Sequence, residues 1–292
     1  MEKLKMLSVE MSPIVQGFWR LTEWNTSADE VIKFINQCVD RGVTTIDTAE
    51  IYGDTECESQ LGRALAKDPA VRGKLEIVSK TGIFRHKGFA YYNTTYNSIK
   101  ASCTASIKRL GCEYLDAYLI HREDPCMDPW EAGRALTDLK KEGLIREFGV
   151  SNFDPFKLNA INTATEGQIV TNQIEWNPLC YEHFQSGMMD YLTEKKMRPM
   201  IWSPLAGGEV FTKEGQMYTA VRNVLNELAE KYDTCPATII YAWIMYHPAG
   251  ALPISGSNKI NRLQQAIDAL DIKLDHWDWY KLYCASDKAI LR

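Results

Sequence analysis

Short apolar runs recur along the chain, and between them apolar residues return at every third or fourth position. The runs are continuous rather than alternating, and several are rich in β-branched residues, as expected of parallel strands that are buried on both faces. The intervening segments have the period of amphipathic helices. This pattern predicts eight strands: Ile14–Phe18, Val43–Ile46, Leu75–Val78, Leu115–Ile120, Phe148–Val150, Ile169–Thr171, Pro199–Ile201 and Ala251–Ile254.

Capping residues mark the expected helix ends. Ser27 and Glu30 have the spacing of a capping box, in which each side chain bonds the main-chain N–H of the other residue. Gly42 stands where the helix that they open needs a left-handed residue to end. Thr55 and Glu58 repeat the spacing and predict a second capping box. Most of the predicted strands are therefore followed by a predicted helix.

The order of these elements predicts the fold. Alternating strands and helices over 292 residues, without a linker or a break in composition, indicate one parallel (β/α)8 TIM barrel. We expect residues 1–292 to form a single domain. A doubly wound parallel sheet is the alternative fold, but the glycine fingerprint expected after its first strand is absent.

Composition and charge exclude several classes of protein. Hydrophobic residues make up 45% of the chain, which allows a large core, and the net charge of −5 without basic runs argues against a nucleic-acid binder. No apolar run is long enough to cross a bilayer, and the N-terminal segment lacks the apolar region of a secretory signal. The eight cysteines without a CxxC pair fit reduced thiols. We therefore expect a cytoplasmic protein that binds neither nucleic acid nor membrane.

Polar and aromatic side chains stand within two residues of the ends of predicted strands. In a (β/α)8 barrel the carboxyl ends of all strands open onto one face, where barrel enzymes carry their active sites. One such residue alone is more often structural, but several of them at one rim converge and predict an active site. Seven residues occupy these positions: Asp47, Lys80, His121, Asn152, Gln173, Trp202 and Ser255.

Tyr52 follows Asp47 by five residues and completes a set suited to proton transfer. A free tyrosine has a pKa of about 10, which is too high for acid chemistry near neutral pH. We expect the ammonium of Lys80 to lower the pKa of Tyr52, with Asp47 holding Lys80 in place. His121 is expected to orient a carbonyl oxygen beside Tyr52.

Two other patterns point to different chemistry and are rejected. Tyr96 and Lys100 have the Y-x3-K spacing of short-chain dehydrogenases, but that family also needs the missing glycine fingerprint, so we predict exposed helix residues. The segment from His121 to Pro129 partly matches a zinc-deaminase signature, but Pro129 stands where the last cysteine ligand belongs. No metal site is predicted.

Several segments resemble those of the aldo-keto reductase superfamily, most closely its bacterial members described only as oxidoreductases. The similarity runs from about Gly17 to Gln265, and the segments occur in the order DTAEIYG, IVSK, LDAYLIH, FGVSN, TNQIE, WSPL and ISGSNKINRL. The resemblance implies a (β/α)8 barrel enzyme that reduces the carbonyl of a small molecule with NAD(P)H and uses no metal.

The resemblance also implies a role for each catalytic candidate. Tyr52 corresponds to the general acid, Lys80 and Asp47 to the pair that tunes its pKa, and His121 to the residue that orients the carbonyl.

A larger set corresponds to cofactor-binding residues of the family. Some bind the nicotinamide by its carboxamide or by stacking, and others contact the pyrophosphate, the adenosine 2′-phosphate or the adenine. Ser151, Asn152 and Gln173 correspond to the carboxamide-binding residues and Trp202 to the ring that stacks on the nicotinamide. Ser203 and Leu205 correspond to the pyrophosphate contacts. The 2′-phosphate segment contains Ser255, Gly256, Ser257, Lys259 and Arg262, and Gln265 corresponds to an adenine contact. Gly17, Trp19, Arg20 and Gly207 are also expected at the cofactor.

The 2′-phosphate segment predicts that the cofactor is NADPH (NADP+). A helix N-terminus and an arginine both favour a phosphate group. One departure concerns the adenine, because Gln265 and Ala266 stand where many members have Glu-Asn. We expect this change to weaken adenine binding.

Two other functions are left open by the sequence. A cofactor-binding sensor or regulatory subunit would keep the fold with little turnover, and a sugar or alcohol dehydrogenase would work in the oxidising direction. The intact set of Asp47, Tyr52, Lys80 and His121 favours an enzyme. The substrate and the oligomeric state are not readable from the sequence.

Overall fold

All eight predicted strands form in the computed structural model, which describes residues 1–290. They are β3 (Val15–Gly17), β4 (Thr45–Asp47), β5 (Glu76–Thr81), β8 (Leu115–Ile120), β9 (Ile145–Ser151), β10 (Ile169–Glu175), β11 (Met200–Trp202) and β12 (Leu252–Ser255). Their hydrogen-bonded order, β10-β11-β12-β3-β4-β5-β8-β9, closes a barrel, and neighbouring strands such as β4 and β5 are parallel. The predicted (β/α)8 class is confirmed.

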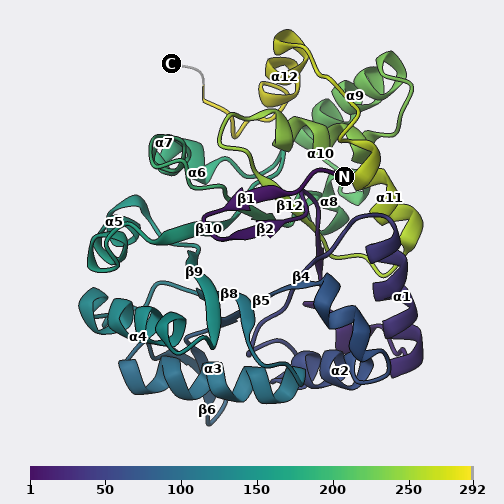
Figure 1. Ribbon diagram of the computed structural model, residues 1–292. Helices are drawn as coiled ribbons and strands as arrows, with labels where there is room; N and C mark the ends of the chain where they lie inside the picture. Colours follow the sequence, from purple (N-terminus) through teal and green to yellow (C-terminus); the bar gives the residue numbers. More distant parts are fainter. Residues whose placement is uncertain (291–292) are drawn as a thin grey trace. The chain divides into compact units, whose positions relative to one another are not determined.

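The chain divides into two compact units, Met1–Gln173 and Ile174–Arg292. That residues 1–292 form one domain therefore stays a prediction. In the first unit the strands alternate with helices, which are η1 (Leu21–Glu23), α1 (Ala28–Asp40), α2 (Glu56–Leu65), η2 (Pro69–Lys74), α3 (Tyr96–Leu110), α4 (Pro129–Lys141) and α5 (Pro155–Ala164). Helices α2, α3 and α4 lie one after another along the outside of β5 and β8 (Figure 1).

The two predicted capping boxes have different outcomes. Ser27 and Glu30 form the predicted box at the start of α1, and Gly42 after this helix has a φ angle of 82°. Thr55 before α2 has a φ angle of 77° and makes no side-chain cap, so the second box is wrong. A threonine at an N-cap needs an extended backbone for its hydroxyl to reach the next turn, and the left-handed turn at Thr55 prevents this.

Two hairpins were not predicted. Strands β1 (Leu4–Met6) and β2 (Val9–Met11) form one, and β6 (Ile83–His86) and β7 (Phe89–Tyr92) form the other. Ser8, between β1 and β2, donates its main-chain N–H to Oε1 of the buried Glu147 of β9 at 2.9 Å. The strands of the two hairpins have only three or four residues each, which is too few for a hydrophobic period to be recognised in the sequence.

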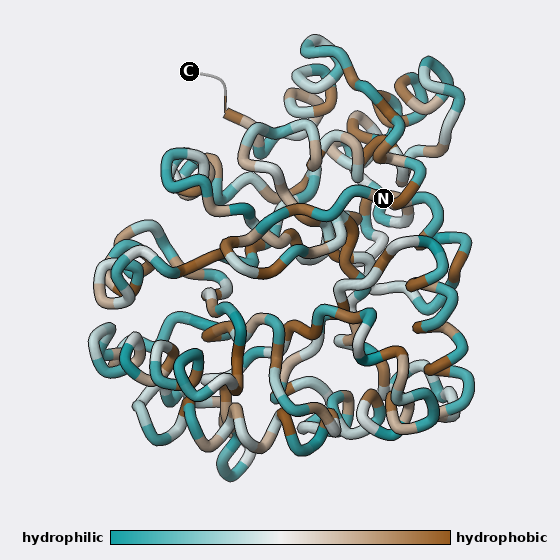
Figure 2. The backbone as a smooth tube through the Cα atoms, in the orientation of Figure 1, coloured by the Kyte–Doolittle hydropathy of each residue, from teal (hydrophilic) through white to brown (hydrophobic). Residues whose placement is uncertain are grey.

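The second unit is built mainly from helices around an aromatic interior. Trp243 and Trp279 stack with ring centroids 5.5 Å apart, and each indole N–H donates to the other residue's main-chain carbonyl. Hydrophobic, brown stretches follow the barrel strands of the first unit in Figure 2, whereas outer helix turns are mostly teal. The helices of the second unit are α6 (Glu182–Gln185), α7 (Met188–Glu194), η3 (Ala206–Gly208), α8 (Glu209–Thr212), α9 (Gln216–Lys231), α10 (Pro236–Tyr246), α11 (Ile260–Asp268) and α12 (His276–Tyr283).

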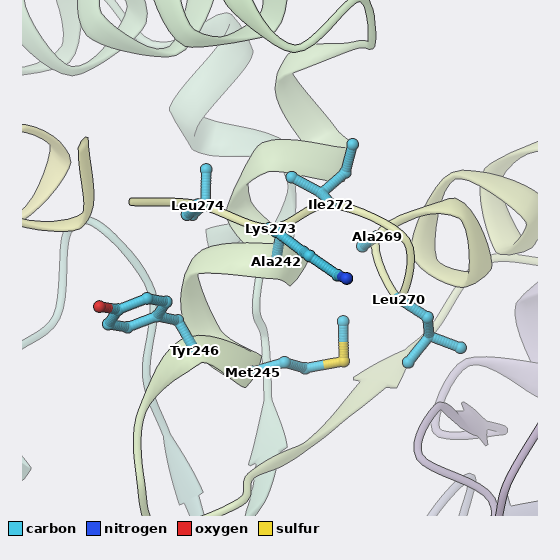
Figure 3. Close-up of a pocket in the computed structure, with 8 residues that line it drawn as sticks. All are labelled: Ala242, Met245, Tyr246, Ala269, Leu270, Ile272, Lys273 and Leu274. Carbon is cyan, nitrogen blue, oxygen red and sulfur yellow. The ribbon is translucent and has the colours of Figure 1, made fainter. Parts of the chain in front are cut away.

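The second unit also contains a cavity of about 340 Å³ beside α10 (Figure 3). Met245 and Tyr246 of α10 line it together with five residues that follow α11: Ala269, Leu270, Ile272, Lys273 and Leu274. None of its lining residues is a predicted site residue. Across residues 1–290, every helix is too short or too polar to cross a bilayer.

Candidate active site

Tyr52 lies in a strained loop between β4 and α2. Asp47 ends β4 and is 3% exposed, and Tyr52 is half-buried. The three residues after Tyr52, Gly53, Asp54 and Thr55, all have positive φ angles, of 57°, 51° and 77°. This conformation is unfavourable for the two residues that are not glycine, and such strain concentrates at functional sites. The backbone thus turns sharply directly after the phenol.

Lys80 of β5 is the centre of the candidate site, and its side chain is fully buried. Its Nζ lies 2.7 Å from Oδ1 of Asp47, 2.8 Å from the main-chain oxygen of Thr48 and 3.2 Å from Oη of Tyr52. An ammonium has three donors, so each of them has an acceptor. The buried charge is therefore both paired and hydrogen-bonded, as burial in a protein requires. The structure brings together Asp47, Tyr52 and Lys80 as predicted.

Burial and charge act against each other on the pKa values of this pair. Burial alone would lower the pKa of Lys80, but Asp47 and Tyr52 outweigh it and leave the pKa raised, so Lys80 stays charged. Burial raises the pKa of Tyr52, and the Lys80 ammonium acts in the lowering direction without offsetting burial. The ammonium acts in the predicted direction, but the predicted net lowering of the pKa of Tyr52 is wrong. Burial destabilises the phenolate by more than the one neighbouring cation stabilises it.

His121 follows β8 directly, is 8% exposed, and its ring centroid lies 5.5 Å from that of Tyr52. Burial, together with the charges of Lys80 and Arg122, lowers the pKa of His121 well below 6.5. The imidazole is therefore neutral near pH 7 and carries one N–H donor. Its Nδ1 has no hydrogen-bond partner among residues 1–290. The structure thus places the fourth catalytic candidate beside the phenol.

Three predicted nicotinamide-binding residues form one hydrogen-bond network in the first unit. Oγ of Ser151, the last residue of β9, donates to the main-chain oxygen of Gln173 at 2.9 Å. Nδ2 of Asn152 donates to Oγ of Ser151 at 2.8 Å. Nε2 of Gln173 donates to Oδ2 of Asp47 at 2.8 Å. The amides expected at the cofactor are therefore linked to the partner of Lys80.

The residues after β3 lie beside the same tyrosine. Gly17 ends β3 and is paired in register with Asp47 of β4. Trp19 is 56% exposed, with its ring centroid 6.3 Å from that of Tyr52. The guanidinium of Arg20 lies over the Trp19 ring at 5.1 Å. A partly exposed indole and a cation thus lie near the phenol.

In the second unit, the predicted pyrophosphate segment follows β11. Trp202 ends this strand, and Leu205 precedes η3. Ser203 and Gly207 have φ angles of 49° and 64°. A Cβ built on Gly207 would meet no atom within 4 Å, so the main chain is open there. Backbone of this kind offers N–H groups to an anion, which fits the pyrophosphate of a nicotinamide cofactor.

The predicted 2′-phosphate segment follows β12 and leads into α11. Ser255 ends β12 and is buried, and a Cβ on Gly256 would again meet nothing within 4 Å. Oγ of Ser257 accepts the main-chain N–H of Lys259 at 3.2 Å. Lys259 is the N-cap of α11 and supplies no side-chain cap, so the first N–H groups of the helix have no side-chain acceptor from this residue.

Lys259, Arg262 and Gln265 are the remaining residues that are predicted at the adenosine end of the cofactor, and Ala266 follows Gln265. Lys259 and Arg262 are exposed, and neither has a salt bridge to another described residue. Gln265 is half-buried and uses its main-chain oxygen to accept the hydroxyl of Thr238 at 2.9 Å. Ala266 is fully buried and offers no polar side chain.

Sequence reasoning missed some residues of the site. The main-chain oxygen of Thr48 accepts from Lys80, and the charge of Arg122 acts on both Tyr52 and His121. A main-chain acceptor leaves no signal in a sequence, whereas the arginine directly after a predicted catalytic histidine could have been noticed. Tyr96 and Lys100 do lie on a helix, but they are half-buried rather than exposed, because they bond Asp138 and Glu142 at the next helix.

Comparisons with known proteins identify the family of this chain. The uncharacterized oxidoreductase YcsN of Bacillus subtilis is 40% identical over 289 residues, which are 95% of this chain and 95% of the relative. A 6-dehydroglucose reductase of Agrobacterium fabrum is 37% identical and covers 94% of each chain. The crystal structure of an aldo/keto reductase from Klebsiella pneumoniae in complex with NADP and acetate superposes with a TM-score of 0.83, at 25% identity and over 100% of this chain and 98% of that one.

The model of the Aldo/keto reductase family matches residues 13–283, nearly the whole chain. The chain therefore belongs to the aldo/keto reductase family, and it is an NAD(P)H-dependent oxidoreductase.

Proposed function

We propose that this enzyme reduces an aldehyde or ketone to an alcohol with NADPH and that Tyr52 is the general acid. The observation that carries the proposal is the 3.2 Å contact between Nζ of Lys80 and Oη of Tyr52, with Lys80 held by Asp47. A pure cofactor-binding sensor has no need of a buried ammonium against a phenol. We therefore favour an enzyme over a sensor or regulatory subunit.

The side chains of the first unit supply the proton chemistry. A bound nicotinamide cofactor supplies the hydride that reaches the carbonyl carbon. Oη of Tyr52 donates its proton to the carbonyl oxygen, and the Lys80 ammonium stabilises the phenolate that remains. The neutral imidazole of His121 donates a hydrogen bond to the same oxygen. Asp47 keeps Lys80 charged and in place.

In this proposal the cofactor-binding residues of each unit keep their predicted roles. Ser151, Asn152 and Gln173 bind the nicotinamide carboxamide, and Trp202 stacks on the ring. The main-chain N–H groups of Ser203, Leu205 and Gly207 bind the pyrophosphate. The open glycines and the α11 N-terminus without a side-chain cap support this assignment. The specificity for NADPH over NADH rests on Ser255, Gly256, Ser257, Lys259 and Arg262 around the 2′-phosphate, with Gln265 at the adenine.

Sugar aldehydes are the first substrates to test. One relative is named a 6-dehydroglucose reductase. The indole of Trp19 is 56% exposed beside Tyr52 and gives a sugar ring an aromatic surface for packing, and the Arg20 guanidinium nearby can donate to its hydroxyls. The eight cysteines are all free thiols, which supports the proposed cytoplasmic location.

The test is a panel of sugar, aliphatic and aromatic carbonyls, assayed with NADPH and with NADH, and the matching alcohols assayed with the oxidised cofactors. We expect turnover of at least one carbonyl class with NADPH. Cofactor binding without turnover of any carbonyl or alcohol would favour the sensor. Faster alcohol oxidation at saturating substrates and neutral pH would favour a dehydrogenase.

A further inference from the structure

Three charged side chains form a cluster beside the segments that carry Tyr52 and Lys80. Glu58 of α2 has no exposed surface, and Nε of Arg109 of α3 donates to its Oε2 at 2.7 Å. Nη2 of Arg109 also lies 3.5 Å from Oε1 of Glu50. We call Glu50, Glu58 and Arg109 the Arg109 cluster. None of the three takes part in the proposed reaction.

The Arg109 cluster is bonded to both neighbours of Lys80 in β5. Oγ of Ser79 donates to Oε1 of Glu58 at 2.5 Å, and Oγ1 of Thr81 donates to Oε2 of Glu50 at 3.1 Å. Alternate residues of a strand point to opposite faces. Ser79 and Thr81 therefore hold the strand from the side opposite to the one on which Lys80 projects.

Glu50 connects the same cluster to the loop of the phenol. It lies two residues before Tyr52, and its main-chain N–H donates to the main-chain oxygen of Lys80 at 3.0 Å. One guanidinium thus bridges the loop that positions Tyr52 and, through Glu58 and Ser79, the strand that positions Lys80. Its side chain is 20% exposed, so water screens these contacts only partly.

We propose that Arg109 is a positioning residue that sets the separation between Oη of Tyr52 and Nζ of Lys80. The inference rests on the proposed role of Tyr52 as general acid. The attraction between phenolate and ammonium weakens with distance, so a loosened loop makes the phenolate less favourable. In the first unit the charges of Lys80, Asp47 and Arg122 act on Tyr52, and the ring of His121 packs against it. The contact between Lys80 and Tyr52 is tied to the Arg109 cluster at both ends.

The experiment compares Arg109→Met, which keeps the length of the side chain but removes its charge, with Arg109→Lys. For Arg109→Met we expect kcat to fall by about tenfold or more, as for a small misplacement of a reacting group. The midpoint of the pH profile for alcohol oxidation moves upward, because oxidation needs the phenolate. The Kd of NADPH stays unchanged, and Arg109→Lys recovers part of the loss. Arg63→Met, which breaks an exposed ion pair with Glu56 on α2, is the matched control and leaves kcat and midpoint as in the native enzyme.

Thr81→Val is a second, milder variant for the case that Arg109→Met does not fold. It removes only the hydroxyl that bonds Glu50, so we expect it to fold. It should shift the midpoint in the same direction by a smaller amount. A native midpoint in Thr81→Val and in each Arg109 variant that folds overturns the inference. Tyr52→Phe, measured alongside, separates the two claims. If it keeps its turnover, the proposed function fails, whereas lost turnover in Tyr52→Phe with native midpoints in the other variants rejects only the role of Arg109.

Discussion

Nε2 of Gln173 donates to Oδ2 of Asp47 at 2.8 Å, although 126 residues separate the two in the chain. The other carboxylate oxygen, Oδ1, accepts from Nζ of Lys80 at 2.7 Å. One buried carboxylate therefore connects an amide proposed to bind the nicotinamide with the ammonium proposed to tune the phenol. In the proposed mechanism, this carboxylate couples cofactor binding to proton transfer.

Gln173→Leu should weaken both processes at once. The substitution removes one hydrogen bond from Asp47 and the proposed carboxamide contact, and a hydrogen bond to a charged group contributes about 1.5–3 kcal/mol. We expect the affinity for NADPH and kcat each to fall by about tenfold. Fluorescence titration and steady-state kinetics measure them separately. Gln185→Leu, which loses a bond to the main-chain oxygen of Lys288, is the control. A normal kcat in Gln173→Leu would show that the bond to Asp47 does not matter for the reaction.

Tyr52→Phe should remove carbonyl reduction while cofactor binding persists. A general acid typically contributes about 10²–10⁴-fold to the rate, and the phenylalanine keeps the ring but not the proton. The checks are kcat with the best carbonyl substrate and the Kd of NADPH. Tyr96→Phe is the control, because its hydroxyl bonds Asp138 on the neighbouring helix. If Tyr52→Phe keeps more than half of the native kcat, Tyr52 is not the general acid.

Substitution of His121 should alter the acid stability of the protein. The pKa of His121 is lowered well below 6.5 in the folded protein, chiefly by burial. Below about pH 6.5 the imidazole of His121 is protonated in the unfolded chain but stays neutral in the folded protein. The free energy of unfolding therefore falls by up to about 1.4 kcal/mol per pH unit as the pH decreases. This contribution to stability is present above pH 6.5 and is lost as the pH falls toward the folded pKa.

His121→Gln should therefore lose less of its free energy of unfolding between pH 7 and pH 5 than the native protein does. Urea unfolding at a series of pH values measures the difference. His86→Gln, at an exposed position, should follow the native curve. Parallel curves for the native protein and His121→Gln would contradict the lowered pKa.

Arg262→Ala should weaken the binding of NADPH but not that of NADH. If Arg262 bonds the 2′-phosphate, its loss weakens the affinity for NADPH by about one to two orders of magnitude. The affinity for NADH stays unchanged, because NADH lacks this group. Titration of the intrinsic fluorescence with each cofactor gives both constants. Gln264→Ala, on the same helix and bonded to Asp268, controls for a general effect on α11. Equal weakening of both cofactors would remove Arg262 from the 2′-phosphate site.

Gly62→Ala tests the close approach of α2 and α3. A Cβ at Gly62 would lie 2.0 Å from the main-chain oxygen of Arg109, which cannot move as a flexible side chain would. Alanine favours a helix over glycine by about 1 kcal/mol, but we expect the overlap to outweigh this and to lower the free energy of unfolding by about 1–3 kcal/mol. Gly73→Ala, whose Cβ would meet nothing within 4 Å, should be close to neutral. A Gly62→Ala variant as stable as Gly73→Ala would mean that the helices move apart at little cost.

The sequence by itself determined the elements whose signals are local. Continuous apolar runs identified all eight barrel strands because both faces of a parallel strand are buried, and Ser27 with Glu30 identified the start of α1 because a capping box lies within one helical turn. The candidates Asp47, Lys80 and His121 were visible for the same reason, since each stands where an apolar run stops.

Only the tertiary structure decided which of these groups touch and with what net effect. The bond from Gln173 to Asp47 and the bridge from Arg109 to Glu50 join segments that are distant in the chain, and no local pattern encodes such contacts. The Thr55 cap failed because the turn after Tyr52 imposes a left-handed backbone on it. The pKa of Tyr52 rises rather than falls because burial, a property of the packed interior, outweighs the single charge of Lys80 that the sequence made visible.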